Sequence, residues 1–138
     1  RGQYGRKWIS SKGNLFVSFF NELNKTNLSI NTITKINCLL VKKLLSTFTR
    51  KKITFKKPND LLIDKKKISG ILQEVIFLNK KKFLITGIGI NIIKNPYIKN
   101  NPTTNLQEVT KKNISKLSVE NKLKQFFEKS LFKLYKIN

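Results

Sequence analysis

The sequence contains no histidine, a single cysteine, three prolines and only 7 acidic residues among 138. Without histidine there is no Cys/His pattern for a metal ion, and the lone Cys38 cannot form an internal disulfide. Such a chain is typical of a reducing compartment, so we expect a cytoplasmic protein. Because no histidine is present to activate Cys38, a small packing residue is favoured there over a nucleophile.

Long apolar segments are also missing. No run approaches the roughly 18 residues of a membrane helix, and no secretory leader is visible, so a membrane partner is not expected. The length predicts one domain at most, residues 1–138, and a hydrophobic content of 39% with 10 Phe argues against disorder. Because the chain starts at Arg1, inside what reads as a functional loop, we expect a fragment that is incomplete at its N-terminus.

What is present in excess is positive charge: 29 basic residues against 7 acidic ones give a net charge of +22. Such an excess is typical of proteins that bind nucleic acid or another polyanion. The lysines, however, are scattered through predicted turns and helix faces and do not form one stripe with interleaved aromatics. We therefore favour compositional drift, with some contribution from an anionic substrate, and disfavour nucleic acid as a partner.

The apolar pattern predicts both strands and helices. Strands are expected at residues 14–23, 52–55, 61–63, 68–78 and 83–90. Helices are expected at residues 31–48, capped by Asn31 or Thr32, and from a cap at Ser118 to the C-terminus, with a helical turn at 106–109. Strands joined by hairpins and covered by helices predict an α+β domain. We expect a mixed, largely antiparallel sheet with helices on one face.

Residues 56–74 combine three features that suit a ligand site. A Pro-Asn-Asp turn presets the backbone, and it is followed by a short apolar strand and a second apolar run. Gly70 interrupts that run, which often marks a bulge or a ligand close to the backbone. Asp60, Asn59 and Lys67 could thus face one cleft and hold a metal-bound polyphosphate. An ordinary hairpin with a solvated lysine run explains the stretch equally well.

Two further segments are rich in glycine. Residues 1–8 form a glycine-spaced basic loop suited to phosphate, and Trp8 could stack on a purine or serve as a core anchor. Residues 86–91 (Thr-Gly-Ile-Gly-Ile-Asn) lack the third glycine of a dinucleotide-binding fingerprint. Their glycines still allow a ligand or a neighbouring strand to approach, and Asn91 offers a donor and an acceptor to a base edge.

Together these segments resemble the biotin protein ligases. Residues 1–8 resemble the family's glycine-arginine loop, and residues 56–60 its Lys-Trp-Pro-Asn-Asp motif. Residues 67–74 are similar to its Lys-x-x-Gly-Ile-Leu-x-Glu strand, and residues 87–91 to its Gly-Ile-Gly-Ile-Asn segment. The resemblance implies the fold of the biotin/lipoate ligase catalytic domain. It also implies a ligase that joins biotin to ATP and passes biotin to a lysine of a biotin carboxyl carrier domain, of acetyl-CoA carboxylase or another biotin-dependent carboxylase.

The resemblance also implies roles for individual residues. Lys67 and Arg1 match catalytic positions, at the biotin carboxylate and α-phosphate and in the loop that closes over the adenylate. The positions that match the biotin site are Arg1, Gly2, Gln3, Lys67, Gly70 and Leu72. The positions that match the ATP site are Arg6, Trp8, Asn14, Lys56, Asn59 and Asn91, and Asp60 matches the metal side, which implies Mg²⁺.

The sequence departs from this family's pattern in several places. Gln3 stands where the family usually has arginine, and Lys57 where it has tryptophan. The family's upstream segment, its C-terminal small barrel and a helix-turn-helix are not expected within residues 1–138. Two alternatives stay open, a lipoate or octanoate ligase or transferase of the same fold and a non-catalytic basic nucleic-acid-binding domain. The oligomeric state, including a homodimer, is also open.

Overall fold

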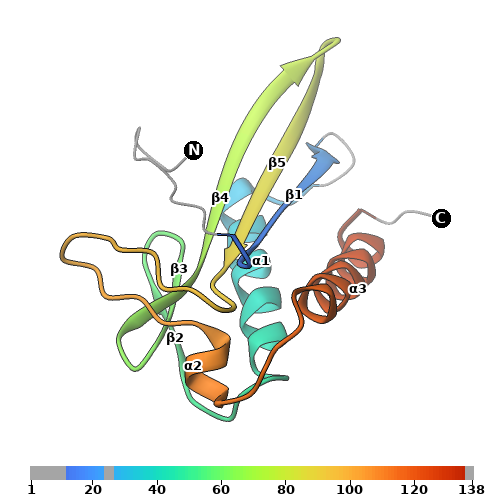
Figure 1. The fold of residues 1–138 in the computed structure, drawn as a ribbon. Helices are drawn as coiled ribbons and strands as arrows, with labels where there is room; N and C mark the ends of the chain where they lie inside the picture. Colours follow the sequence, from blue (N-terminus) through green and yellow to red (C-terminus); the bar gives the residue numbers. More distant parts are fainter. Residues whose placement is uncertain (1–11, 24–26, 136–138) are drawn as a thin grey trace.

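The computed structural model describes residues 12–23 and 27–135, with side chains up to residue 130. An antiparallel sheet carries two long helices on one face (Figure 1). The elements in chain order are β1 (Leu15–Glu22), α1 (Ile30–Leu45), β2 (Ile53–Lys56), β3 (Asp60–Ile63), β4 (Lys66–Leu78), β5 (Lys81–Ile90), α2 (Leu106–Thr110) and α3 (Lys116–Tyr135).

The five strands are ordered β1-β5-β4-β3-β2, and each neighbouring pair is antiparallel. The predicted α+β class, with helices covering one face of the sheet, is confirmed. The sheet was expected to be mixed; among the described residues the parallel contact is an isolated bridge between Lys67 and Thr103. β4 and β5 form a long hairpin that extends beyond the helices (Figure 1). Its turn is tight because Asn79 and Lys80 both have positive φ, as in a type I′ turn.

The helix boundaries correct two predicted caps. α1 is capped by Ser29, whose side chain accepts a hydrogen bond from Thr32 N, and not by Asn31 or Thr32. α3 begins at Lys116, and Ser118 lies inside it: Ser118 N donates to Ser115 Oγ over 3.3 Å. In both cases the hydroxyl that accepts from an amide three residues later lies a few positions earlier than the apolar pattern indicated.

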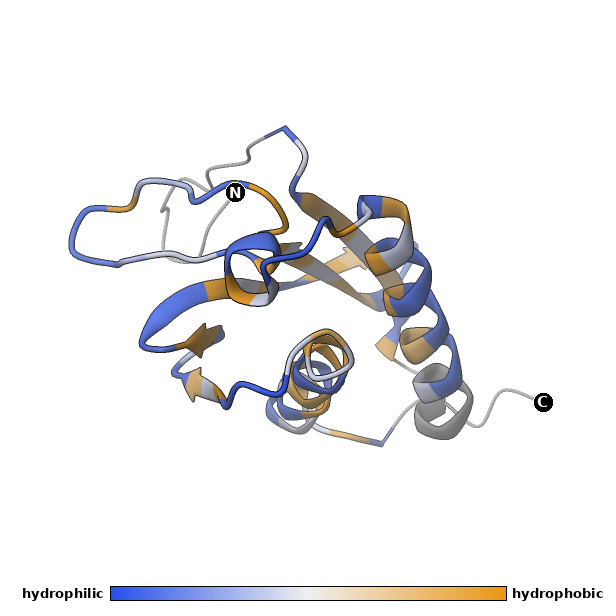
Figure 2. Cartoon of the chain, turned by 60° about the horizontal axis from the view of Figure 1, so that its bottom comes forward, coloured by the Kyte–Doolittle hydropathy of each residue, from blue (hydrophilic) through white to orange (hydrophobic). Residues whose placement is uncertain are grey.

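The core lies between the sheet and the two long helices. Along β1, Leu15, Val17 and Phe19 pack into it, and the Phe19 ring stacks on Phe127 of α3 with centroids 4.5 Å apart. α1 crosses β4 and β5, where Asn37 Nδ2 donates to Thr86 Oγ1. Hydrophobic and hydrophilic residues alternate around both helices (Figure 2). Among the described residues, α1 and α3 cover one face of the sheet and leave the other open (Figure 1).

Candidate functional site

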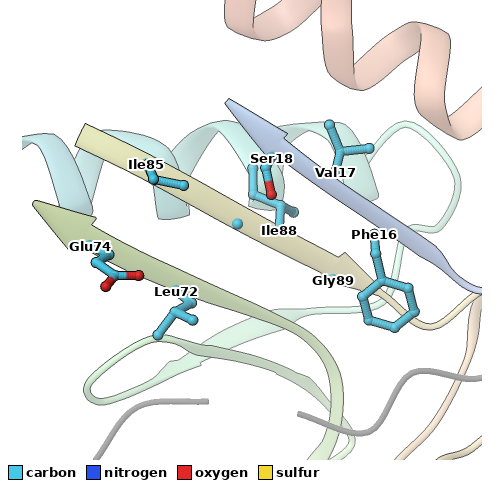
Figure 3. A pocket seen from close by; sticks show the side chains of 9 residues that line it. Phe16, Val17, Ser18, Leu72, Glu74, Ile85, Ile88 and Gly89 are labelled. Atoms are coloured by element: carbon cyan, nitrogen blue, oxygen red, sulfur yellow. The ribbon is translucent and has the colours of Figure 1, made fainter. Parts of the chain in front are cut away.

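The open face of the sheet carries a cavity of about 290 Å³. In the register of the sheet, Ser18 of β1 lies beside Gly87 of β5, which lies beside Leu72 of β4. Figure 3 shows Phe16 and Leu72 on one side of these strands and Val17 on the other. The cavity is lined by Phe16, Val17, Ser18, Leu72, Glu74, Ile85, Gly87, Ile88 and Gly89.

Glycine keeps the floor of this cavity flat. A Cβ placed on Gly87 would meet Leu72 O at 3.8 Å and Ser18 Oγ at 4.0 Å, which are ordinary contact distances. Packing therefore does not require glycine at this position; what the missing side chain provides is open space above the strand. The glycines of residues 86–91 were predicted to let a ligand or a neighbouring strand approach closely. A neighbouring strand does so, because Gly89 of β5 pairs with Gly70 of β4.

An ion pair lies next to the cavity. Lys67 Nζ is 2.9 Å from Asp60 Oδ1, and the two side chains are 19% and 22% exposed. Asp60 belongs to the same cross-strand row as Gly70 and Gly89, and Gly89 lines the cavity. Partners in one row share a face of the sheet, so the carboxylate and the cavity lie on the same side. Asp60 and Lys67 therefore meet as predicted, although neither is among the residues that line the cavity.

A β-bulge turns Lys67 toward this face. Lys67 and Gly70 are three residues apart, so strict alternation would place them on opposite faces of the sheet. The β3–β4 register shifts, however: Asp60 pairs with Gly70, whereas Leu62 pairs with Lys67. The extra residue in β4 reverses the alternation and brings Lys67 to Asp60.

Two residues expected at the ATP site, Asn59 and Lys56, lie near this ion pair. Asn59 donates from its side-chain amide to Ile71 O, and its own carbonyl accepts from Ile71 N over 2.9 Å. Lys56 is exposed and donates to Asn101 Oδ1 over 3.0 Å. The exposed ammonium remains accessible to an anion, whereas the Asn59 amide stabilises the turn that precedes β3.

The two asparagines expected at the nucleotide have partners within the fold. Asn14 is 1% exposed, and its Oδ1 accepts from three successive backbone amides after β5. Asn91 donates to the carbonyls of Lys67 and Thr104. Nucleotide contact by either side chain stays a prediction.

Some expected site residues lie outside the described residues. These are Arg1, Gly2, Gln3, Arg6 and Trp8. Phe16 and Ser18 also line the cavity, although no motif in the sequence marks them as site residues. The alternation in β1 shows that they share a face, but only the register with β5 shows that this face is the open one.

One titrating group lies near the ion pair but on the helix side. Burial, and secondly the charge of Asp60, raise the pKa of the Cys38 thiol to about 11. Cys38 is 6% exposed and belongs to the core, which confirms the predicted packing role.

The described ranges lack a metal-ligand cluster and a membrane-spanning helix. No group of three or more metal-ligating side chains occurs within residues 12–23 and 27–135. No helix in the same ranges is long and apolar enough to cross a membrane.

Comparison with known proteins gives consistent results. The chain is 31% identical over 94 residues to the bifunctional ligase/repressor BirA of Escherichia coli (strain K12), a match that covers 67% of this chain and 29% of BirA. It is 32% identical, with a TM-score of 0.82, to a biotin protein ligase from Aquifex aeolicus in complex with biotin and ATP, over 99% of this chain and 57% of that one. A biotin protein ligase from Leishmania major in complex with biotin shares the fold, with a TM-score of 0.79 at 24% identity over 91% of this chain and 57% of that one.

The chain thus spans less than two thirds of the length of each of these relatives. Residues 1–91 match the model of one family, and they include the Lys67–Asp60 ion pair and the glycine floor of the cavity. The chain belongs to the biotin/lipoate A/B protein ligase family.

Proposed function

We propose that this protein activates biotin with ATP to form biotinyl-5'-AMP and transfers the biotinyl group to a lysine of a biotin carboxyl carrier domain. The observation that carries the proposal is the Lys67–Asp60 pair, 2.9 Å apart, beside a cavity with a glycine floor. The family match and the similarity to an Aquifex aeolicus ligase bound to biotin and ATP support it. Residues 1–138 would act as the catalytic domain, and a carboxylase carrier domain in the cytoplasm would be the partner.

The cavity suits a small ligand with an apolar body. Its volume of about 290 Å³ is at the lower end of the usual range for small-molecule sites, about 300–1,000 Å³. Leu72 and Phe16 offer apolar walls, and Gly87 lets a ring lie against the strand. In this arrangement biotin lies on the sheet, with its carboxylate toward Lys67.

The first chemical step brings two anions together. An oxygen of the biotin carboxylate attacks the α-phosphorus of ATP, the bond to the β-phosphate oxygen breaks, and pyrophosphate leaves. The Lys67 ammonium, whose side chain is 19% exposed, would offset the negative charge that builds up between these groups. This stabilisation is larger in a site that excludes water than it would be in open solvent. Asp60 would help to hold Mg²⁺, which would supply charge neutralisation at the leaving group.

The second step is acyl transfer. The carrier lysine amine attacks the carbonyl carbon of the mixed anhydride, an amide bond forms, and AMP leaves with the bonding electrons. The proton that the amine loses in this step passes to solvent. Lys67, close to the same carboxyl group, would stabilise the oxyanion that forms on the carbonyl.

The test measures pyrophosphate release by the intact protein with ATP and either biotin or lipoate. Biotin-dependent release supports the proposal. We expect Lys67→Ala to lower this rate about 100-fold or more, because one preorganised charge is lost. Lys66→Ala, which removes the neighbouring exposed lysine, is the matched control and should keep the wild-type rate.

Three outcomes would count against the proposal. Wild-type release by Lys67→Ala would remove the catalytic role of Lys67. Release with lipoate or octanoate, but not with biotin, would assign the protein to the lipoate branch of the family. Salt-sensitive nucleic-acid binding without any release would instead favour the non-catalytic alternative.

A further inference from the structure

The backbone N–H and C=O of Lys67 bond to a loop and not to β5, while on its other side Lys67 pairs with Leu62 of β3. Pairing of β4 with β5 ends at Ser69 and Ile90. Beyond that point Lys67 N donates to Pro102 O over 2.8 Å, and Lys67 O accepts from Thr104 N over 2.9 Å. The position of Lys67 therefore depends on how the loop of residues 94–105 is fixed to the sheet.

Asn91 connects these parts. It follows β5 directly, and its Nδ2 donates to Lys67 O over 3.3 Å and to Thr104 O over 3.1 Å. A side-chain amide has two N–H donors, and both are used here. Asn91 N also donates to Ile68 O over 2.9 Å. One residue thus joins the end of β5, the start of β4 and the loop.

Asn14 in turn orients Asn91. Asn14 Nδ2 donates to Asn91 Oδ1 over 3.4 Å and to Lys94 O over 3.1 Å. Its Oδ1 accepts from the amides of Ile92, Ile93 and Lys94 over 2.9 to 3.1 Å. Because Asn14 is 1% exposed, water cannot replace these bonds.

We propose that Asn91, oriented by Asn14, is a positioning residue for the Lys67 ammonium, a role that rests on the proposed function. The physical reason is that a displacement of about 1 Å in a catalytic charge can cost about 100-fold in rate. Asn91 acts on Lys67 through its hydrogen bonds to the Lys67 backbone and to the loop that holds it. Its effect on catalysis therefore requires that Lys67 be present.

The decisive experiment is a double-mutant cycle on biotin-dependent pyrophosphate release by the intact protein. Asn91→Ala should lower kcat about 10-fold or more, with the KM for biotin changed less than about 2-fold. In the Lys67→Ala background the same substitution should have little further effect, because the charge that it positions is already absent. Asn121→Ala, an exposed asparagine on α3, is the matched control and should keep wild-type kinetics.

A second variant separates positioning from folding. Asn14→Asp keeps an oxygen for the three backbone amides but removes the donors to Asn91 and Lys94. We expect several-fold lower kcat and faster hydrogen exchange at the amides of Lys67 and Thr104 than in the rest of the sheet, which distinguishes local loosening from the lower global stability that the loss of two buried bonds causes. Wild-type exchange and kcat in this variant would overturn the proposal.

The double-mutant cycle also distinguishes a failure of the positioning role of Asn91 from a failure of the proposed function of Lys67. If the effects of Asn91→Ala and Lys67→Ala on kcat add, the two residues act independently and the positioning role is wrong. If Lys67→Ala alone leaves the rate unchanged, the proposed function of Lys67 fails instead.

Discussion

Burial controls the chemistry of the single cysteine. Cys38 lies on α1 against the sheet, 6% exposed, and its thiol pKa rises from 9.0 to about 11, first through burial and then through the charge of Asp60. The folded state therefore keeps the proton that the unfolded chain gives up at lower pH. The thiolate needed for a nucleophile is disfavoured, in agreement with a packing role.

The raised pKa of Cys38 makes the stability of the fold fall with pH in a defined range. Because the folded pKa is raised, the stabilising contribution of Cys38 is complete below pH 9 and is lost as the pH rises to about 11. We expect wild type to lose about 2–3 kcal/mol more unfolding free energy over this range than Cys38→Ala. Urea unfolding of both proteins at a series of pH values measures this difference. Parallel pH profiles would contradict it, and the variant also controls for lysine titration.

A second residue-scale prediction concerns the cavity floor. Gly87→Ala adds a methyl group whose closest neighbours, Leu72 O and Ser18 Oγ, are 3.8 and 4.0 Å away. The sheet should therefore accommodate it, with the unfolding free energy within about 1 kcal/mol of wild type. A ligand lying on the strand would be displaced, so we expect biotin affinity to fall about 10-fold or more.

Calorimetric titration of biotin, paired with thermal unfolding, tests this prediction. A thermal midpoint near wild type with weakened binding is the expected pair of results. Unchanged affinity would place the ligand elsewhere on the molecule.

At the scale of elements, the short helix α2 anchors the loop that holds Lys67. Asn105 is 7% exposed; its Oδ1 accepts from Glu108 N over 2.8 Å, and its Nδ2 donates to Asn95 Oδ1 over 2.7 Å. The carboxylate of Glu108 accepts from Asn95 and Thr104. The hydrogen bond from Asn95 is the main cause that lowers the pKa of Glu108. Helix cap and loop are thus one hydrogen-bonded unit.

Removing this cap should destabilise the protein measurably. Asn105→Ala loses both side-chain bonds and leaves Asn95 Oδ1 without that donor, so we expect a loss of about 1–2 kcal/mol. Ser29→Ala, which removes the exposed cap of α1, is the comparison and should cost less. Denaturant unfolding measures both variants; equal losses would show that the Asn105 network adds nothing to ordinary capping.

At the scale of the whole molecule, basic residues far outnumber the acidic residues that could pair with them. The described ion pairs use four acidic residues, whereas the chain carries 29 basic ones. A net charge of +22 repels itself in the compact state. Some lysines lie over aromatic rings, such as Lys122 with its Nζ 4.4 Å from the centroid of Phe48, which offsets part of this repulsion.

Salt should therefore stabilise the protein. Between about 0.05 and 0.5 M salt the repulsion is screened, and we expect the thermal midpoint to rise by about 2–5 °C. Sodium chloride and potassium chloride should act equally at the same ionic strength. A midpoint that falls with salt would show that attractive ion pairs outweigh the net charge.

Much of this protein is readable from the sequence alone. Local patterns determine the strands and the helices, because apolar alternation and helical spacing are properties of neighbouring residues. They also identify Asp60 and Lys67 as candidates, since the turn and the motif around them are contiguous. The class of fold and the family follow from these segments.

Only the tertiary structure decides which of these residues meet. The β-bulge that turns Lys67 toward Asp60 is a matter of strand register, and no local pattern encodes it. The contacts of Asn14 with Asn91 and with residues 92–94 span nearly eighty positions, so their role in holding Lys67 is invisible in the sequence. Chain neighbours fix the elements, whereas long-range pairing fixes which faces and side chains come together to form the site.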